Sequence, residues 1–300
     1  MRKSNIIATA ALLFTAVIWG LSYSAQAEAM KSMQALSFVF LRYVIGAAIL
    51  LPAFFTGKRL NRKLLTGGIF CGIFLAGGEI LQQFGLLYTT AGKAGFLTAL
   101  YVIMIPLIGI FISLRSDWKI WLAAFVSMAG TYLLCSDGTL NSFGNPGDFL
   151  VLICALFFAL QFIAIAKFAP DAPPLKLAAI EFITVAILSG IASFFAGETL
   201  SWTCITATAG PLLYCGVGAI GIASTIQIAA QKYVNAATSS IILSTASVFA
   251  VIWGWLLLGE SYSCTNLIGC VLIFIAVLFV QLSQSKAVNG IETEDKGTAA

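Results

Sequence analysis

Long apolar runs, most of them close to 20 residues, alternate with short polar segments along almost the whole chain. A helix needs about 20 mainly apolar residues to cross the hydrocarbon core of a bilayer, so each run predicts one membrane-spanning helix. Turn-forming residues occupy most connections, as in DGTLNSFGNPGD. The ten predicted spans lie at residues 6–26, 34–55, 65–88, 94–114, 118–136, 148–168, 176–196, 209–230, 236–258 and 264–282.

The composition agrees with a chain that faces lipid. Hydrophobic residues make up 60% of the sequence and charged residues 9%, with a mean hydropathy of +1.00. A soluble domain carries about 25% charged residues, so this chain lacks the polar surface that water requires. The sequence has no histidine, which excludes imidazole bases and histidine-ligated metals. We therefore predict an all-α membrane protein with no metal, no cofactor and no nucleic-acid partner.

Lysine and arginine are distributed unequally between the two predicted sides. If the N-terminus is cytoplasmic, 13 of them fall in inner segments and 2 in outer ones. This is the asymmetry that the positive-inside rule requires. We expect a multi-pass protein of the cell inner (plasma) membrane with both termini in the cytoplasm. The AQA motif near the end of the first run resembles a signal-peptidase site, but the run is long for a signal core, so we expect Met1 to be retained.

The chain repeats itself weakly. A shift of 145 places YTTAGKAGFLT (88–98) on YVNAATSSIIL (233–243), whereas a shift of 144 places Gly72 on Gly216, so the register slips by one within that span. At a shift of 139, the run containing Arg42 falls on the run containing Glu181. The predicted division is residues 1–137 and 138–283, two five-helix repeats, followed by a disordered tail at 284–300. An odd number of spans in each repeat makes the second inverted relative to the first.

Three charged residues lie well inside predicted spans, away from the span ends: Arg42, Glu79 and Glu181. A charge at the bilayer centre costs roughly 2.5–3.5 kcal/mol, so intramembrane charges pair or face a wet cavity. We expect Arg42 to pair with Glu79, and a role in handling substrate or ions is the alternative. Glu181 has no basic neighbour in its span core and is the candidate for proton coupling, because burial without a partner favours a neutral carboxyl group. The alternative is that Glu181 extends to the headgroups or to Lys176.

Several motifs resemble the EamA type of the drug/metabolite transporter superfamily. They are AVIWGLSYS (16–24), FLRYVIGAAIL (40–50), GLLYTTAGKAGFLTALYVIMIPL (85–107) and AQKYVNAATSSIILSTASVFAVIWGWLLLGE (230–260). The resemblance implies a ten-helix carrier of two inverted repeats that moves small metabolites by alternating access, often outward. The ninth span lacks the proline usual in the family, which puts its bend in doubt. Pro106 supports a kink and a hinge in the fourth span.

The resemblance also implies a central cavity lined by spans 1, 3, 4, 6, 8 and 9. Polar and aromatic residues gather at similar depths in these spans, and a buried amide must find a hydrogen-bond partner. The predicted substrate-binding residues are Trp19, Ser22, Gln82, Tyr101, Gln161 and Gln227. For any one glutamine, hydrogen bonding between helices is the alternative, worth about 0.6 kcal/mol per bond.

The expected function is secondary transport of a small amphipathic solute, such as an amino acid or a drug, with export as the expected direction and proton coupling as an open addition. Arg42 and the amides suit a carboxylate-bearing solute, and the aromatic residues suit its apolar part. The alternatives are a channel or facilitator and, with less support, an intramembrane enzyme or a scaffold. The expected partners are the solute and lipid, and a homodimer is left open.

Overall fold

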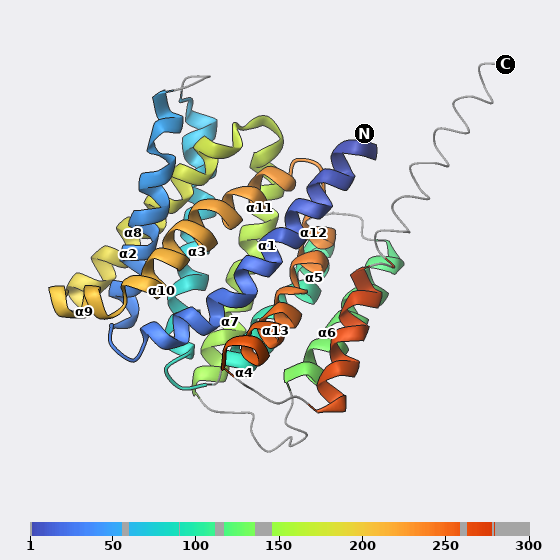
Figure 1. Ribbon diagram of the computed structural model, residues 1–300. Helices are drawn as coiled ribbons and strands as arrows, with labels where there is room; N and C mark the ends of the chain where they lie inside the picture. Colours follow the sequence, from blue (N-terminus) through green and yellow to red (C-terminus); the bar gives the residue numbers. More distant parts are fainter. Residues whose placement is uncertain are drawn as a thin grey trace.

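The computed structural model describes residues 2–55, 60–89, 91–111, 117–135, 146–258, 263–277 and 279, and every regular element among them is a helix (Figure 1). The α-helices are α1 (Arg2–Ala29), α2 (Ala35–Leu50), α3 (Arg62–Gly85), α4 (Ala91–Ala99), α5 (Tyr101–Phe111), α6 (Trp118–Cys135), α7 (Pro146–Phe168), α8 (Pro174–Phe195), α9 (Trp202–Ala207), α10 (Ala209–Leu213), α11 (Thr225–Ala230), α12 (Ala236–Leu243) and α13 (Ala246–Leu258). A π-helical segment, Tyr214–Ser224, joins α10 to α11, and a further helix covers Cys264–Val277. Short 3₁₀ turns follow α2 (Leu51–Phe55) and α7 (Ala169–Asp171).

Six helical stretches among the described residues are long and apolar enough to cross a membrane, and shorter apolar helices accompany them. The six are Ser4–Ala29, Ala35–Phe55, Arg62–Gly85, Pro146–Asp171, Pro174–Phe195 and Ala209–Ala230. Large apolar side chains such as Phe14, Ile187 and Phe195 point outward with more than half of their surface exposed. Water does not favour so many exposed apolar side chains, whereas lipid does.

Parts of the sequence-based predictions lie outside the described residues. These parts are Met1, the tail at 284–300, and the basic residues Lys58, Arg59, Arg115, Lys286 and Lys296.

Local signals in the sequence start several of these helices. The side chain of Asn61 accepts a hydrogen bond from the backbone N–H of Leu64 at 2.8 Å and caps α3, and Asn235 caps α12 through Thr238 at the same distance. Such caps satisfy backbone donors that lack a partner in the first turn of a helix. At α8, Pro174 is the first helical residue, where its missing N–H costs nothing.

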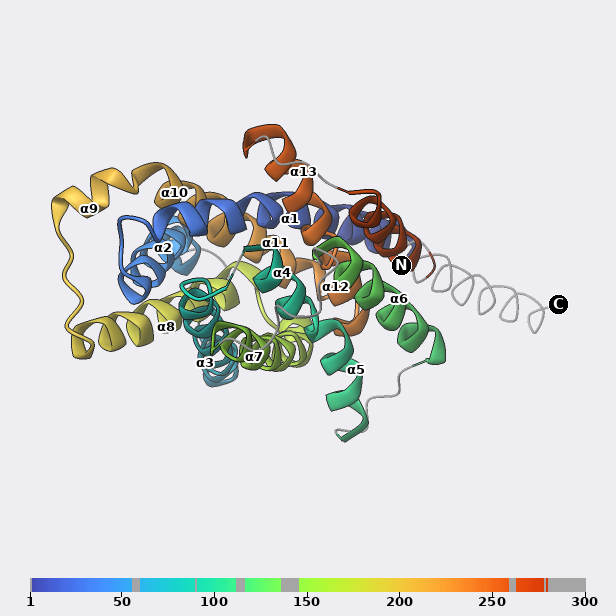
Figure 2. The same cartoon turned by 90° about the horizontal axis from the view of Figure 1, so that it is seen from below.

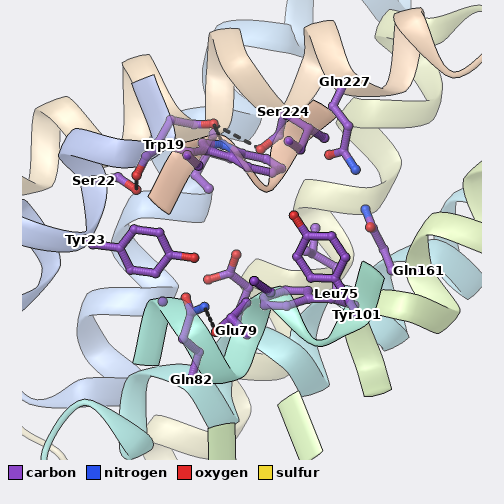
Figure 3. A pocket seen from close by; sticks show the side chains of 18 of the residues that line it. Trp19, Ser22, Tyr23, Leu75, Glu79, Gln82, Tyr101, Gln161, Ser224 and Gln227 are labelled. Carbon is purple, nitrogen blue, oxygen red and sulfur yellow. Dashed lines mark hydrogen bonds between the residues drawn. The ribbon is translucent and has the colours of Figure 1, made fainter. Parts of the chain in front are cut away.

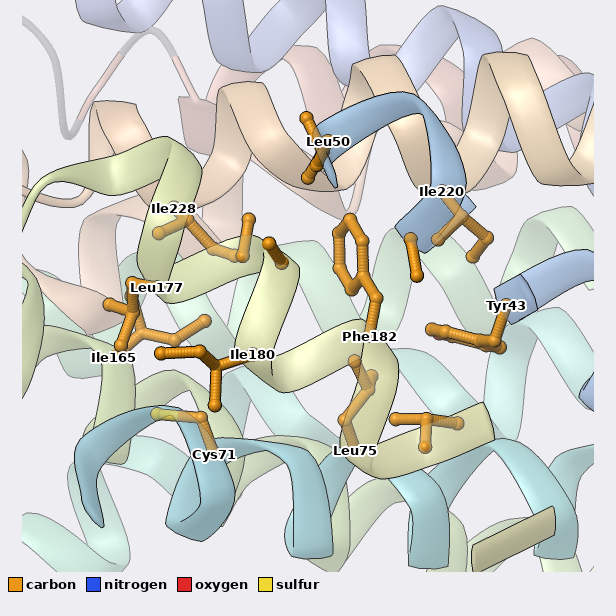
Figure 4. Close-up of a cluster of buried hydrophobic side chains, with 14 of the residues drawn as sticks. Tyr43, Leu50, Cys71, Leu75, Ile165, Leu177, Ile180, Phe182, Ile220 and Ile228 are labelled. Atoms are coloured by element: carbon orange, nitrogen blue, oxygen red, sulfur yellow. The ribbon is translucent and has the colours of Figure 1, made fainter. Parts of the chain in front are cut away.

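The two halves of the chain interlock, and the most extensive contacts between helices join one half to the other. Helix α3 packs against α7 and α8, α2 packs against α8 and the π-helical segment, and α1 packs against α13 (Figures 1 and 2). The core shown in Figure 4 contains Tyr43 and Leu75 from the first half, and Ile165, Phe182 and Ile220 from the second. Each half therefore completes the hydrophobic core of the other.

Equivalent contacts recur between the halves. A Cβ on Gly72 of α3 would lie 2.8 Å from the Glu181 carbonyl oxygen and 2.5 Å from the Thr184 Cβ. A Cβ on Gly216 would lie 3.1 Å from the Arg42 carbonyl oxygen and 2.7 Å from the Ile45 Cβ. The sequence shifts of 144 and 139 that relate the halves also relate these two contacts. Only glycine permits such close approach of two helices, so the repeat is present in the packing as well as in the sequence.

The one-residue slip in the repeat has a structural counterpart. Positions 72 and 82 are ten apart in α3, whereas the corresponding positions 216 and 227 are eleven apart. The extra residue falls where the second half has the π-helical segment, while α3 is α-helical throughout. A π-bulge arises where one residue more than the α-helical pattern must fit into a turn.

Two shorter helix pairs are each interrupted, and at equivalent positions. The break between α4 and α5 lies at Leu100, and the break between α12 and α13 lies at Ser244 and Thr245. Helices α4 and α12 begin at Ala91 and Ala236, a shift of 145. The same shift relates the first residues of α5 and α13.

The positions of these breaks bear on two predictions, the kink and hinge at Pro106 and the bend of the ninth span. Pro106 lies inside α5, so the interruption is six residues upstream of it; the proline removes a single backbone bond, which α5 tolerates. The ninth predicted span does break, although it has no proline there. The hydroxyls of Ser244 and Thr245 each donate to the carbonyl three residues back, at 2.7 Å. Such bonds compete with the helical pattern and bend helices.

Candidate functional site

A cavity of about 80 Å³ lies between the two halves, and all six predicted substrate-binding residues line it (Figure 3). A water molecule needs about 10–15 Å³, so the space accommodates several waters or a small organic group. Its walls come from α1, α2, α3, α4, α5, α7, α8, the π-helical segment, α11, α12 and α13. Spans 2 and 7, which the resemblance did not imply, also reach the cavity, through Arg42 and Phe182.

The charged residues of the cavity wall, among those described, are Arg42 and Glu79, which form an ion pair between α2 and α3. Arg42 donates to one carboxylate oxygen of Glu79, and the hydroxyl of Tyr43 donates to the other at 2.9 Å. The guanidinium group also lies 5.3 Å from the centre of the Phe38 ring, within the range of a cation–π contact. The structure thus brings together the two charges that the sequence predicted to pair, and it places them at the cavity as well.

The three predicted glutamines differ in their hydrogen bonds. The amide of Gln82 donates to Thr98 at 3.1 Å, and that of Gln161 donates to Glu181 at 2.8 Å. The amide nitrogen of Gln227 is buried and has no hydrogen-bond partner in the described part of the protein. A buried donor without a partner costs free energy, so Gln227 is the glutamine best placed to gain a bond from a solute or a water.

The opposite wall is built on the π-helical segment. The indole N–H of Trp19 donates to the carbonyl of Ala219 at 3.2 Å, and the hydroxyl of Ser224 donates to the same carbonyl at 3.0 Å. The hydroxyl of Ser22 donates to the carbonyl of Trp19 at 2.8 Å. In a π-helical turn the backbone N–H groups pair with the carbonyls five residues back rather than four, and Ser224 lies five residues after Ala219. Here the carbonyl of Ala219 fixes both the indole ring and a hydroxyl at the cavity.

Aromatic rings complete the wall. The rings of Tyr101 and Phe162 stack with centres 5.2 Å apart and planes 20° apart. In Figure 3 the Glu79 carboxylate points into the cavity between Tyr23 and Tyr101. The cavity therefore combines one acidic group with several π faces.

The surroundings of Glu181 bear on both sequence-based expectations. It is fully buried, so its side chain does not extend to the headgroups. It is not without a partner either, because one carboxylate oxygen accepts the hydrogen bond from Gln161. The other oxygen is buried with no hydrogen-bond partner among the described residues. Gln161 consequently links the cavity wall to Glu181 behind it.

Some wall residues were not among the predicted site residues, although the internal repeat points to them. The shift of 139 carries Trp19 onto Phe158 and Ser22 onto Gln161. The same shift carries Tyr23 onto Phe162, and all of these residues line the cavity. The repeat that relates the first and sixth spans therefore identifies Phe158 and Phe162 as wall residues from the sequence.

The comparison with known proteins follows the same division of the chain. The sequence profile of the EamA-like transporter family matches residues 6–136 and again residues 145–282. The chain belongs to the EamA-like transporter family. This EamA-like chain is thus a multi-pass membrane protein of two repeats and a transporter of small solutes.

Relatives support the assignment over almost the full length. A protein of Archaeoglobus fulgidus named "Uncharacterized transporter" is 31% identical over 287 residues, covering 93% of this chain and 87% of the relative. "Uncharacterized transporter YwfM" of Bacillus subtilis is 24% identical and covers 95% and 96%. A crystal structure of a protein with 19% identity matches with a TM-score of 0.76, over 93% of this chain and 98% of the other, and supports the fold alone.

Proposed function

We propose that this EamA-like chain is a secondary transporter that crosses the membrane ten times and carries a small amphipathic solute by alternating access. The observation that carries the proposal is the cavity between two interlocked, sequence-related halves. Transporters built from inverted repeats bind their solute at the repeat interface and open to each side by rocking one group of helices against another. The close glycine contacts at Gly72 and Gly216 provide smooth surfaces for such sliding.

The broken helices support the same mechanism. The ends of α4 and α12 meet the cavity near Thr98 and Leu243, and the breaks follow within two residues. An interrupted helix can change its direction with few backbone bonds lost, because the break has already given up the regular pattern. We propose Leu100 and Ser244–Thr245 as the points about which the wall moves.

We further propose that both termini face the cytoplasm. Segments assigned to the inner side by their positive charge contact each other: Lys63 pairs with Asp171 at 2.5 Å, and Lys232 donates to the carbonyl of Ala172 at 2.8 Å. Segments assigned to the outer side do likewise, since Glu198 accepts a bond from the N–H of Ser37 at 2.7 Å. A periplasm-active reporter fused after Ala300 should be inactive, and its activity would contradict this topology.

Export and proton coupling complete the proposal. Glu181 is the candidate proton site, because it is a buried carboxyl group with a free oxygen and is linked to the cavity through Gln161. A proton taken up there would alter the Gln161 bond and so the cavity wall.

Reconstitution into proteoliposomes tests the transport function. Solute-loaded vesicles should take up labelled solute by saturable counterflow, whereas empty vesicles should not accumulate it. Flux that rises linearly with concentration would indicate a channel or facilitator. A complete absence of flux for amines, amino acids and neutral solutes alike would contradict a carrier.

A further inference from the structure

We infer that the cavity selects solutes through a cationic amine, which binds at the carboxylate of Glu79. The inference rests on the proposed function for its physiological meaning and names the substrate class of that same cavity. It departs from the expectation that Arg42 would recognise a carboxylate.

The exposure of the two side chains decides the sign of the charge at the wall. The Arg42 side chain is 2% exposed and that of Glu79 is 12% exposed. Arg42 lies among the rings of Phe38 and Tyr43, whose centres are 5.3 and 5.7 Å from the guanidinium carbon. Both residues line the cavity, but the pair therefore exposes more of its negative end than of its positive end.

The carboxylate retains the capacity to bind more donors. Two carboxylate oxygens offer about four lone-pair positions. Arg42 and Tyr43 supply one donor each, to different oxygens. An ammonium group has three donors and no acceptor, so it fits the remaining positions, whereas a solute carboxylate would meet Glu79 with like charge.

The other residues of the cavity wall also favour a cationic solute. Trp19, Tyr101 and Phe162 supply π faces, which attract a cation within about 6 Å of a ring centre. Among the described residues of the wall, Arg42 is the cation, and no lysine joins it. The cavity volume of about 80 Å³, where a water needs about 10–15 Å³, leaves room for a compact amine.

Three compounds of nearly equal shape test the inference on the purified full-length protein in detergent. Benzylamine is the cation, benzoate the anion and benzyl alcohol the neutral control. Affinities are measured by isothermal titration and by the shift in melting temperature. Benzylamine should bind at least about tenfold more tightly than either analogue, a difference of about 1.4 kcal/mol. Benzoate binding as tightly as benzylamine, or no binding of benzylamine, would overturn the inference.

Variants locate the amine. Glu79→Gln should lower benzylamine affinity about tenfold or more, while Glu28→Gln, which removes a carboxylate exposed elsewhere, should leave it unchanged. If Glu79→Gln does not fold because Arg42 is left without its counter-ion, the double variant Arg42→Met with Glu79→Met removes both charges and should fold without binding the amine. Unchanged amine affinity in the variant that folds would overturn the assignment to Glu79.

The outcome of the amine-binding experiment can be distinguished from the outcome of the transport experiment. Amine binding without flux would leave the binding inference standing and contradict the carrier. Saturable flux of an anion with no amine binding would do the reverse.

Discussion

Removal of one member of the Arg42–Glu79 pair should destabilise the protein asymmetrically. Arginine keeps its charge under all ordinary conditions, and its side chain here is 2% exposed. Glu79→Met therefore leaves the buried Arg42 guanidinium group charged and without its counter-ion. Breaking a buried pair in this way costs about 3–5 kcal/mol. Arg42→Met leaves a carboxylate that still accepts the Tyr43 bond and is 12% exposed, so we expect a smaller loss, about 1–3 kcal/mol.

The double variant, Arg42→Met with Glu79→Met, should lose less than the sum of the single losses. The second substitution removes the stranded charge, and two methionines fill much of the same volume. We expect a coupling free energy of about 2–3 kcal/mol, within the range for residues in one network. The measurement is equilibrium unfolding in mixed detergent–SDS micelles, read by tryptophan fluorescence.

A matched pair on the surface gives the control. Lys31 and Glu28 also form an ion pair, at 2.5 Å, but their side chains are 69% and 61% exposed. The same cycle of methionine substitutions there should give a coupling below about 1 kcal/mol. Single losses at Arg42 and Glu79 that add within about 0.5 kcal/mol would refute the contact as an energetic pair. A larger loss for Arg42→Met than for Glu79→Met would refute the reasoning about exposure.

Three further predictions concern transport and packing. Gln227→Ala should reduce counterflow more than Gln82→Ala, because the Gln227 amide nitrogen has no hydrogen-bond partner among the described residues, whereas that of Gln82 donates to Thr98. Losses that follow only the amount of folded protein would assign both to structure. Glu181→Gln should abolish gradient-driven uptake in proteoliposomes while counterflow survives, and an unchanged response to an imposed pH gradient would contradict proton coupling. Gly216→Leu should lower the melting temperature by several degrees, since even a Cβ there would lie 2.7 Å from the Ile45 Cβ; the open position at Gly210 is the control, where the same substitution should change little.

Much of the architecture follows from the sequence, because the length and hydrophobicity of a run of consecutive residues decide whether it can span a bilayer. Runs such as 148–168 and 209–230 are long enough to span, and a helix satisfies their backbone hydrogen bonds in lipid within the segment itself. The predicted Arg42–Glu79 contact follows from the same physics, because a charge in an apolar run needs a partner and few candidates exist. The sequence also shows the slip of one residue between the repeats, and the structure places the π-helical segment at that point.

Only the tertiary structure decided which groups face the cavity. The sequence pattern does not reveal that Arg42 is more buried than Glu79, since that burial depends on Phe38 and Tyr43 packing around the guanidinium group. Nor could it place the breaks, because Pro106 is a strong sequence signal that α5 tolerates, whereas the hydroxyls of the ninth span act only through local bonds. The sequence determined that charges and amides lie within the membrane, and three-dimensional packing determined which of them the cavity presents, because solvent access is a property of all neighbouring helices together.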